Sequence, residues 1–347
     1  MGVRRRPTLT DVAARAGVSV TTASYILNRR SKEMRISADA ARRVQTAAAE
    51  LDYRPNRSAR NLRSASTATI GVITDHVAGG AYASRMLTGA ASAARARDHL
   101  LVIGESEGDP ALEALLIEEM FDRQVDGVVY ATLATSSVTV PRGLRKHRAV
   151  LLNCVDRDER LPGVVPDELE GGRTAAAALL EVGHRGGIFV VGEESEHGTI
   201  AGRLRMQGIR TRLAETGCTL AGVVGSPWSV TPAYDAVSDL LARGVRPDAL
   251  ICLNDRIAMG TYEALREHGL GVPDDVSVVS FDGSELAGWL RPALTSVQIP
   301  YAALGDRAVT ALLSGSQEVQ RLPMPLVAGR SVARAHRSSP GTAATLG

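Results

Sequence analysis

Two short helical patterns near the N-terminus, separated by a glycine, constrain the fold of this chain more than any other feature. Thr8 is a preferred N-cap residue, and Asp11 lies where its side chain completes a capping box. Gly17 ends this first helix, Ser19 is a second N-cap, and residues 20–27 continue with apolar side chains at helical spacing. Such a pair of helices is typical of a helix-turn-helix, which reads DNA with its second helix. An ordinary surface helical hairpin would have the same pattern.

Two further segments extend this N-terminal region. Ser37 can cap a third helix, whose apolar residues are spaced to face the first two helices. A domain of about 55 residues has a marginal hydrophobic core. After Pro55, Asn56 can cap a segment over residues 57–62 that is too short and too polar to form a stable helix alone in water. We therefore expect residues 57–62 to fold only against a surface that supplies the missing free energy.

The positive charge of the chain is concentrated at its N-terminus. The 347 residues carry a net charge of only +2, but residues 1–66 hold 14 Lys and Arg against 5 Asp and Glu, a net charge of +9, which leaves 26 against 33, or −7, for the remainder. This distribution indicates a protein that presents one end to a polyanion, although a basic tail can also be merely solvated. The cations that flank the two suspected DNA-contacting segments are Arg4, Arg5, Arg6, Arg29, Arg30, Arg57, Arg60 and Arg63.

Composition and motifs argue against several other classes of protein. No apolar run reaches the length needed to cross a membrane, and no apolar stretch follows the basic N-terminus as in a signal peptide, so we expect a cytoplasmic protein. Cys154, Cys218 and Cys252 lie far apart without CxxC spacing, which indicates ordinary thiols and no metal site. No GxGxxG after a strand, P-loop, HExxH or GxSxG motif is found, so we expect neither an enzyme nor a cofactor.

From residue 68 onward, short apolar runs alternate with helical patterns. Strands are predicted at residues 68–74, 100–104, 127–130, 149–153, 187–191, 220–224, 249–253 and 276–281. Helices are predicted at residues 84–96, 110–123, 170–182, 200–216, 231–243, 256–268 and 301–313. This alternation predicts parallel sheets with helices on both faces. Because the strands are too many for one sheet of ordinary size, we expect two similar lobes.

Polar side chains follow several of these strands, and the carboxyl ends of parallel strands are where α/β proteins bind ligands. Asn254 and Asp255 follow one strand, Asp282 follows another, Trp228 follows a third, and Arg205 lies in a neighbouring helix. Acids and arginine bind hydroxyl groups and an indole stacks on a sugar ring, so this set favours a polyhydroxylated ligand. Each residue also has a plainer explanation, since Asp255 can cap a helix, Asp282 can shape a turn and Trp228 can pack in the core.

The chain resembles the lac repressor family over nearly its whole length, to about residue 333. The likeness is carried by TLTDVAARAGVSVTTASYILN and RPNRSARNL at the N-terminus, and by RMQG, LNDRIAMG and VSVVSFDGSE further on. It implies a small all-α helix-turn-helix head and an α/β core of two doubly wound parallel-sheet lobes, similar to periplasmic binding proteins. The chain would cross between lobes near Val165, Thr295 and Pro323.

The resemblance also implies domain boundaries. The expected parts are a DNA-binding head at 1–55, a hinge helix and linker at 56–67, a two-lobed core at 68–335 and a flexible tail at 336–347. The first lobe would comprise about 68–165 and 296–323, and the second about 166–295 and 324–335.

In that family, the second helix of the head reads bases in the major groove, here through Val20, Thr21 and Tyr25. The hinge helices of two subunits enter the minor groove together, where Leu62 would wedge apart the central base step. Many members carry arginine at the position of Tyr25, and a tyrosine makes a single contact, so the outer operator bases cannot be taken from relatives. The residues expected to contact DNA are Ser19, Val20, Thr21, Thr22, Ser24, Tyr25 and Asn28 in the head, and Asn56, Arg57, Ala59, Arg60 and Leu62 in the hinge.

The family likeness assigns effector contacts to Arg205, Asp255 and Asp282, beside Trp228 and Asn254. Tyr82 and Arg157 match less exact positions, and His184 matches a family position for which we expect a structural role at a helix end.

The resemblance implies a homodimeric repressor of a sugar-utilisation operon that binds near-palindromic operator DNA and is controlled by a small-molecule effector, a sugar, in the cleft between the lobes. A solute-binding protein shares the two lobes but has no use for the basic head. An architectural DNA-binding protein would have no use for the cleft residues. Both induction and co-repression by the effector are compatible with the sequence. The tail lacks the leucine heptads of a tetramerising coiled coil.

Overall fold

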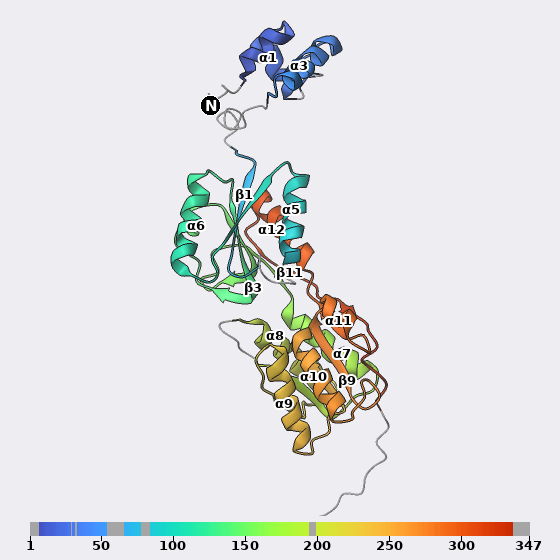
Figure 1. Ribbon diagram of the computed structural model, residues 1–347. Coiled ribbons are helices and arrows are strands. Elements are labelled where there is room, and N and C mark those ends of the chain that lie inside the picture. Colours follow the sequence, from blue (N-terminus) through green and yellow to red (C-terminus); the bar gives the residue numbers. More distant parts are fainter. Residues whose placement is uncertain are drawn as a thin grey trace, which may run out of the picture. The chain divides into compact units, whose positions relative to one another are not determined.

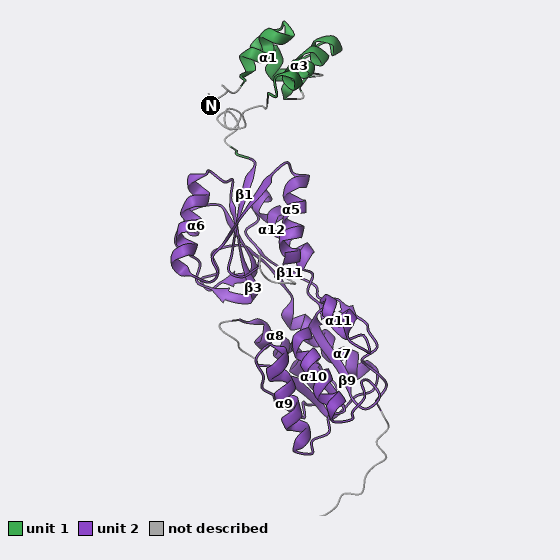
Figure 2. Ribbon diagram, viewed as in Figure 1, with its two compact units in different colours: residues 1–67 green, residues 68–347 purple. Residues whose placement is uncertain are grey.

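The computed structural model describes residues 7–28, 30–31, 33–53, 66–77, 84–193 and 199–335. The chain divides into two compact units, residues 1–67 and 68–347 (Figure 2). Six of the residues expected at binding sites lie outside the described residues: Asn56, Arg57, Ala59, Arg60, Leu62 and Tyr82.

The described part of the first unit contains three helices, α1 (Leu9–Ala16), α2 (Val20–Leu27) and α3 (Ala38–Glu50). The predicted capping box is present, because the Thr8 hydroxyl accepts from the backbone N–H of Asp11, and the Asp11 carboxylate accepts from the backbone N–H of Thr8 at 2.7 Å. Gly17 ends α1 in the left-handed region, with φ of 63°. Ser19 and Ser37 cap α2 and α3 with their side chains, as predicted.

The three helices share one small core. Val12 and Val44 are fully buried, and Ala23 and Ile26 of α2 pack with them. Alanine supplies much of this core, which lets short helices approach closely while burying little apolar area per residue. The position of α2 is therefore fixed by its caps and by this compact core, which leaves its other face outward.

The first lobe of the second unit is a six-stranded sheet with the strand order β11-β5-β4-β3-β1-β2, and all its pairings are parallel. Its strands are β1 (Thr69–Thr74), β2 (Leu100–Glu105), β3 (Val128–Val138), β4 (Ala149–Asp156), β5 (Gly163–Pro166) and β11 (Val319–Leu322). Its helices are α5 (Ser84–Ala96), α6 (Pro110–Asp122), the 3-10 turn η1 (Leu144–Lys146) and α12 (Tyr301–Ser314). Figure 1 shows α6 on one side of this sheet and α5 with α12 on the other.

The second lobe has a six-stranded sheet with the order β12-β10-β9-β8-β6-β7, in which only the edge strand β12 is antiparallel. Its strands are β6 (Ile188–Val191), β7 (Gly222–Val224), β8 (Ala249–Cys252), β9 (Ser277–Asp282), β10 (Thr295–Gln298) and β12 (Leu326–Val327). Its helices are α7 (Glu168–Glu181), α8 (Ala201–Ala214), α9 (Val230–Ala242), α10 (Asp255–Glu267) and α11 (Glu285–Trp289). The fold class predicted from the sequence is confirmed.

The chain passes between the two sheets three times within the second unit. It leaves the first sheet between β5 and α7, returns to it between β10 and α12, and leaves it again between β11 and β12. Thr295 lies in β10 of the second sheet, so the return to the first lobe comes after Gln298. The carboxyl ends of the parallel strands in both sheets therefore lie next to segments that link the lobes.

Neighbouring helices approach closely at glycines. A Cβ atom on Gly89 of α5 would collide with the carbonyl oxygen of Ala302, and one on Gly305 of α12 would collide with that of Met86. Gly172 of α7 and Gly208 of α8 are in similarly close contact with the opposite helix. None of the helices in the described ranges is both long and apolar enough to cross a membrane.

Candidate functional site

The outward face of α2 is small and mixed in character. Val20 is 44% exposed and Thr21 is exposed, while Thr22, Ser24 and Tyr25 are half-buried. These side chains are available to a partner that lies along the helix.

Two other residues expected to contact DNA hold the ends of α2. The Ser19 hydroxyl accepts from the backbone N–H of Thr22 at 3.0 Å, and the Asn28 side-chain amide donates to the carbonyl of Ser24 at 2.8 Å. Both are polar side chains at the ends of the same exposed helix, and their oxygen and nitrogen atoms are already engaged with its backbone.

The loop after α2 places a cation against Tyr25. The Arg30 guanidinium lies 5.5 Å from the centre of the Tyr25 ring and donates two hydrogen bonds of 2.7 Å to the Glu33 carboxylate. Arg30 was expected among the cations near DNA, but its charge is offset by Glu33 and its side chain supports Tyr25. Sequence alone does not reveal this arrangement, because Arg30 and Glu33 both lie outside the predicted helices.

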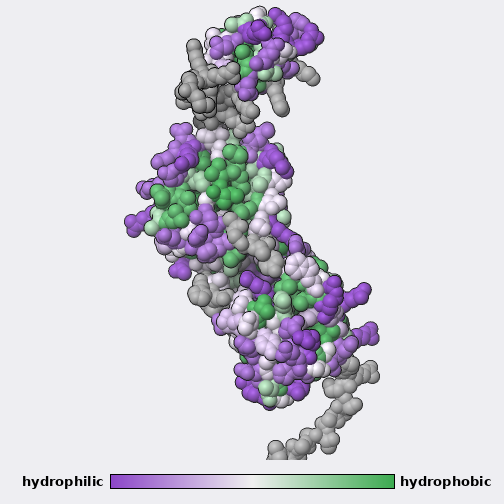
Figure 3. All heavy atoms as spheres, viewed as in Figure 1, coloured by the Kyte–Doolittle hydropathy of each residue, from purple (hydrophilic) through white to green (hydrophobic). Residues whose placement is uncertain are grey.

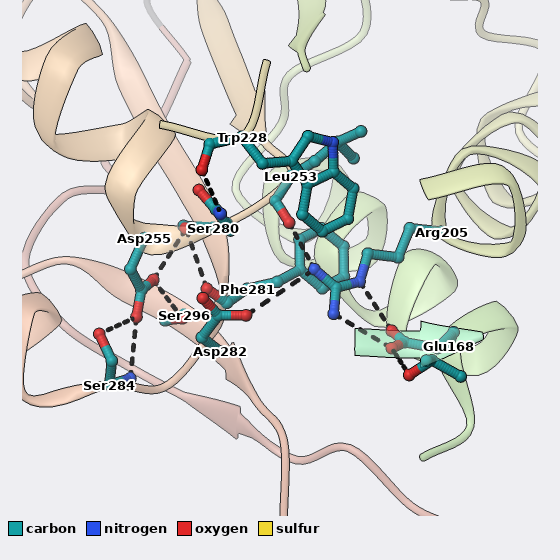
Figure 4. A network of polar contacts seen from close by, with 12 residues as sticks. Glu168, Arg205, Trp228, Leu253, Asp255, Ser280, Phe281, Asp282, Ser284 and Ser296 are labelled. Atoms are coloured by element: carbon teal, nitrogen blue, oxygen red, sulfur yellow. Dashed lines mark hydrogen bonds and ion pairs between the residues drawn. The ribbon is translucent and has the colours of Figure 1, made fainter. Parts of the chain in front are cut away.

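In the second unit, the predicted cleft residues gather around Arg205 of α8 (Figure 4). Its Nε and Nη2 donate to the two oxygens of Glu168 at 2.7 and 3.2 Å, and its Nη1 donates to the carbonyl of Leu253 in a short hydrogen bond. Arg205 and Glu168 are each 1% exposed. A buried ion pair is tolerated only where both partners are well hydrogen-bonded, and this pair meets that condition.

Two aromatic rings cover the Arg205 guanidinium. The ring centres of Trp228 and Phe281 lie 5.3 and 4.6 Å from it, and the Trp228 indole donates to the carbonyl of Glu193 at 3.1 Å. Such cation–π contacts stabilise a desolvated arginine by about 2 kcal/mol. Because Arg205 is 1% exposed, an effector contact by its guanidinium would require neighbouring groups to move, whereas Trp228 is half-exposed.

Asp282, at the end of β9, lies beside this pair. Its Oδ1 atom is 3.9 Å from Arg205 Nη1, and its backbone is in the left-handed region with φ of 101°. A non-glycine residue held in this conformation is strained, and such strain is found most often at binding and active sites. Burial, and next the charge of Asp255, raise the pKa of Asp282 to about 8, although Arg205 opposes this shift. The Asp282 carboxyl group can therefore donate a hydrogen bond near neutral pH.

Asp255 and Asn254 hold the chain segments next to this cluster. Asp255 is fully buried, and its two oxygens accept from the hydroxyls of Ser280, Ser296 and Ser284 and from the backbone N–H of Ser284, all at 2.7–2.8 Å. The helix cap considered for Asp255 belongs to Asn254, whose side chain accepts from the backbone N–H of Ile257 at 2.7 Å. Both of the Asp255 oxygens are engaged within the protein.

Two residues that the sequence reasoning missed join the cluster. Glu168 lies in the first turn of α7, two residues before the predicted helix start, and the Asp167 N-cap would have been its signal. Tyr301 begins α12, which packs in the first lobe, and burial followed by the nearby Asp282 raises its pKa well above the usual value. The cluster thus includes side chains from both lobes.

Arg157 and His184 are not part of this cluster. Arg157 lies in the exposed turn after β4, and in the described part of the chain it makes no hydrogen bond or ion pair with Arg205 or Asp282. Tyr82 lies outside the described residues. His184 is buried at the end of α7, where its Nε2 lies 3.1 Å from Ser277 Oγ and 3.2 Å from the carbonyl of Ala333, which favours a structural role.

The three cysteines are free and buried, and burial raises the pKa of the Cys154 and Cys252 thiols to about 12. Among residues 7–28, 30–31, 33–53, 66–77, 84–193 and 199–335, no group of three or more His, Cys, Asp or Glu is arranged to hold a metal ion.

Comparisons with known proteins match both units. Residues 8–56 match the model of bacterial regulatory proteins of the lacI family, and residues 176–334 match that of a periplasmic binding protein-like domain. The chain is 31% identical over 340 residues to the HTH-type transcriptional repressor PurR of Erwinia tasmaniensis, covering 94% of this chain and 97% of that protein. It is 29% identical over 312 residues to the ribose operon repressor of Escherichia coli K12, covering 88% and 92%. Among solved structures, the lac repressor dimer bound to operator and the anti-inducer ONPF matches with a TM-score of 0.79 and 25% identity, over 95% of this chain and 100% of that one.

Proposed function

Because the chain belongs to the lacI family of bacterial regulatory proteins, we propose that it is a transcriptional repressor controlled by a small molecule. It binds a near-palindromic operator as a homodimer, and a sugar bound between the lobes of its core changes its operator affinity. The DNA-binding head is residues 1–55, the hinge 56–67, the two-lobed core 68–335 and the tail 336–347. The protein acts in the cytoplasm, where the operator DNA lies.

The observation that carries the DNA-binding part of this proposal is the outward face of α2. Its two ends are fixed by Ser19 and Asn28, so that Val20, Thr21 and Tyr25 are left facing outward. A helix of this kind enters the major groove in helix-turn-helix proteins, where a hydroxyl can donate to or accept from a base edge and an apolar side chain can contact a thymine methyl. The net charge of +9 on residues 1–66 supports the phosphate contacts that give affinity and register.

An exposed apolar face on the first lobe supports the dimer. Leu100 and Ile103 of the edge strand β2 are 56% and 45% exposed, and Leu115 of α6 is 53% exposed. Figure 3 shows hydrophobic residues gathered on this lobe over β1 and between α5 and α6. We define Leu100, Ile103 and Leu115 as the β2 face. A contiguous apolar patch beside an unpaired edge strand is a site for protein association, and a second copy of this chain would cover it with the same residues.

The cluster around Arg205 supports the effector site. It lies at the carboxyl ends of strands in the second sheet, where α/β proteins bind ligands. The half-exposed Trp228 ring offers a stacking surface for a sugar, and the Asp282 carboxyl group offers a hydrogen-bond donor or acceptor. Ribose appears in the name of one relative, the ribose operon repressor, which supports a sugar as the class of effector.

The first test is a selection of DNA from a random duplex pool with the purified full-length protein at moderate salt. We expect enrichment of a near-palindrome with a flexible central step, as two half-sites related by a dimer axis require. Retention of DNA without an enriched sequence, both alone and with added cell metabolites, would contradict the repressor proposal. Leu62→Ala is expected to weaken binding to the selected site and reduce DNA bending.

The second test uses the selected operator to screen sugars for a change in affinity. Asp282→Asn is expected to reduce or abolish this response while operator affinity without sugar stays within about twofold. Loss of operator binding itself in Asp282→Asn would contradict the assignment of this cluster to the effector.

A further inference from the structure

We propose that Glu168 selects the effector by its charge. By neutralising Arg205, it allows uncharged polyols to bind at this end of the cleft and excludes anionic ligands such as sugar acids and sugar phosphates. This inference rests on the proposed function, since it concerns the ligand of the same cleft. It assigns a specificity role to a residue that does not itself need to touch the ligand.

The geometry leaves the Nε and Nη2 edge of Arg205 unavailable to an anion. A guanidinium binds a carboxylate or phosphate through two parallel N–H donors. Here the Nε and Nη2 edge is occupied by both oxygens of Glu168, at 2.7 and 3.2 Å. An anionic ligand that took this edge would leave the Glu168 carboxylate buried without its cation, which is strongly unfavourable.

Other groups also crowd the Arg205 guanidinium. Nη1 donates to the carbonyl of Leu253 and lies 3.9 Å from Asp282 Oδ1, and the ring centres of Trp228 and Phe281 lie 5.3 and 4.6 Å from the guanidinium. An uncharged ligand can still profit from the cluster, because its hydroxyls can donate to carboxyl oxygens and accept from the remaining guanidinium hydrogens.

The balance of buried charge at this site also opposes an anion. Among the described residues, Arg205 is the one arginine in the buried core, and it lies close to the acids Glu168 and Asp282, with Asp255 beyond them. On the first lobe, Asp75 follows β1 and accepts from the backbone N–H of Leu133 at 2.9 Å. Because the Asp282 carboxyl group is protonated near neutral pH and Glu168 pairs with Arg205, an anion meets a buried site with no net positive charge to compensate for its lost hydration.

Glu168 could also be a purely structural partner of Arg205, so the test must measure charge selectivity and not stability. The chain has two tryptophans, Trp228 at this cluster and Trp289, which is 68% exposed. Trp289→Phe therefore leaves Trp228 as the only indole, and its fluorescence can be quenched with iodide, caesium and acrylamide at constant ionic strength. Each quenching constant is divided by that of free N-acetyltryptophanamide, which removes the intrinsic differences between quenchers.

In the Trp289→Phe protein, we expect the normalised iodide constant to be no higher than the caesium constant, because Glu168 neutralises Arg205. Adding Glu168→Gln should raise the iodide-to-caesium ratio at least threefold, because Arg205 is then uncompensated. Glu168→Asp keeps the charge and should preserve the ratio of the Trp289→Phe protein. The matched control is Glu215→Gln, which removes one negative charge from the same lobe at a site where Glu215 pairs with Arg173 at 2.7 Å, and it should leave the ratio unchanged.

An iodide constant above the caesium constant in the Trp289→Phe protein would overturn the proposal, and this measurement does not depend on whether Glu168→Gln folds. An unchanged ratio in a folded Glu168→Gln protein, or an equal rise in Glu215→Gln, would overturn it as well. Because these measurements use neither DNA nor effector, their failure leaves the repressor proposal standing. Failure of the DNA selection, in turn, would not change the quenching result.

Discussion

Thr135 Oγ1 donates a hydrogen bond of 2.7 Å to Glu168 Oε1, and this contact joins the two lobes of the second unit. Thr135 lies in β3 of the first sheet and Glu168 in α7 of the second lobe, and both are buried. The same hydroxyl is 2.9 Å from Asn153 Oδ1 in β4, while Glu168 also holds Arg205. A threonine hydroxyl carries one hydrogen, so it can donate either within the first lobe or across to the second, but not to both at once.

Thr135→Val should therefore weaken communication between the cleft and the DNA-binding head. The isosteric valine removes the donor to Glu168, so an effector that changes the Arg205 cluster loses one buried link to the first lobe. We expect the effector-induced change in operator affinity to fall about tenfold, which corresponds to a coupling free energy smaller by about 1.4 kcal/mol. The measurement is fluorescence anisotropy of labelled operator with and without effector.

Thr132→Val is the matched control for this experiment. Thr132 is also buried in β3, but its hydroxyl donates to the carbonyls of Ala134 and Asn153, which both lie in the first lobe. An equal loss of coupling in Thr132→Val would show that any buried hydroxyl of β3 has this effect and would refute the special role of Thr135.

The pKa of Asp282 predicts how stability depends on pH. Burial raises this pKa to about 8, whereas an aspartate in an unfolded chain titrates near 3.9. Between about pH 4 and 8 the folded protein holds a proton that the unfolded chain has lost, so the Asp282 contribution to the free energy of unfolding decreases as pH rises, by at most about 1.4 kcal/mol per pH unit. Above pH 8 this contribution no longer changes.

Asp282→Asn should flatten the pH dependence of unfolding between pH 5 and 8, measured by urea denaturation followed by circular dichroism. Burial also raises the pKa values of Asp75 and Asp255, so part of the slope with the same sign should remain. Asp306→Asn, at an exposed position of α12, is the control and should keep the full slope. If the free energy of unfolding of Asp282→Asn depends on pH as steeply as that of the unsubstituted protein, the Asp282 carboxyl group is ionised throughout this pH range.

Sequence patterns predicted the elements that have strong local signals. The caps Thr8, Ser19 and Ser37 set the starts of α1, α2 and α3, because each cap is a property of a few neighbouring residues. Long buried strands such as β1 and β4 were found as continuous apolar runs. The missed strands β5, β10, β11 and β12 have at most four residues, and β11 contains polar and exposed positions, so their pairing depends on distant partners in the sheet.

The candidate site was predictable only where it follows the strands. Asn254 and Asp282 were found because they come directly after apolar runs. Glu168 was not found, because its partner Arg205 lies 37 positions away and an ion pair between two helices has no local signature. Tyr301 comes from a helix that packs in the other lobe, so only the three-dimensional crossing of the chain brings it near Asp282.

The β2 face predicts the effect of a surface substitution on assembly. Ile103→Lys puts a charge on the edge strand of the first sheet, where a covered interface could not solvate it. We expect the dimer dissociation constant to rise at least 100-fold, about 2.7 kcal/mol, as measured by sedimentation velocity. The control is Val223→Lys, because Val223 is 45% exposed, as is Ile103, and lies on the edge strand β7 of the second sheet. If the Val223→Lys protein dissociates while the Ile103→Lys protein remains a dimer, the interface lies on the second lobe and not on the β2 face.

The contact between α5 and α12 predicts opposite effects for two glycine substitutions. Gly89→Ala would place a methyl group on the carbonyl oxygen of Ala302, so the two helices must separate, whereas Gly288→Ala in α11 adds a methyl group with no atom within 4 Å. Overpacking costs about 1–3 kcal/mol, while alanine gains up to about 1 kcal/mol over glycine in an unhindered helix. Thermal unfolding followed by circular dichroism should therefore show a lower Tm for Gly89→Ala and an equal or higher Tm for Gly288→Ala. An unchanged Tm for Gly89→Ala would mean that α12 can shift away from α5 at no cost, and the close approach would then not fix how the returning chain packs in the first lobe.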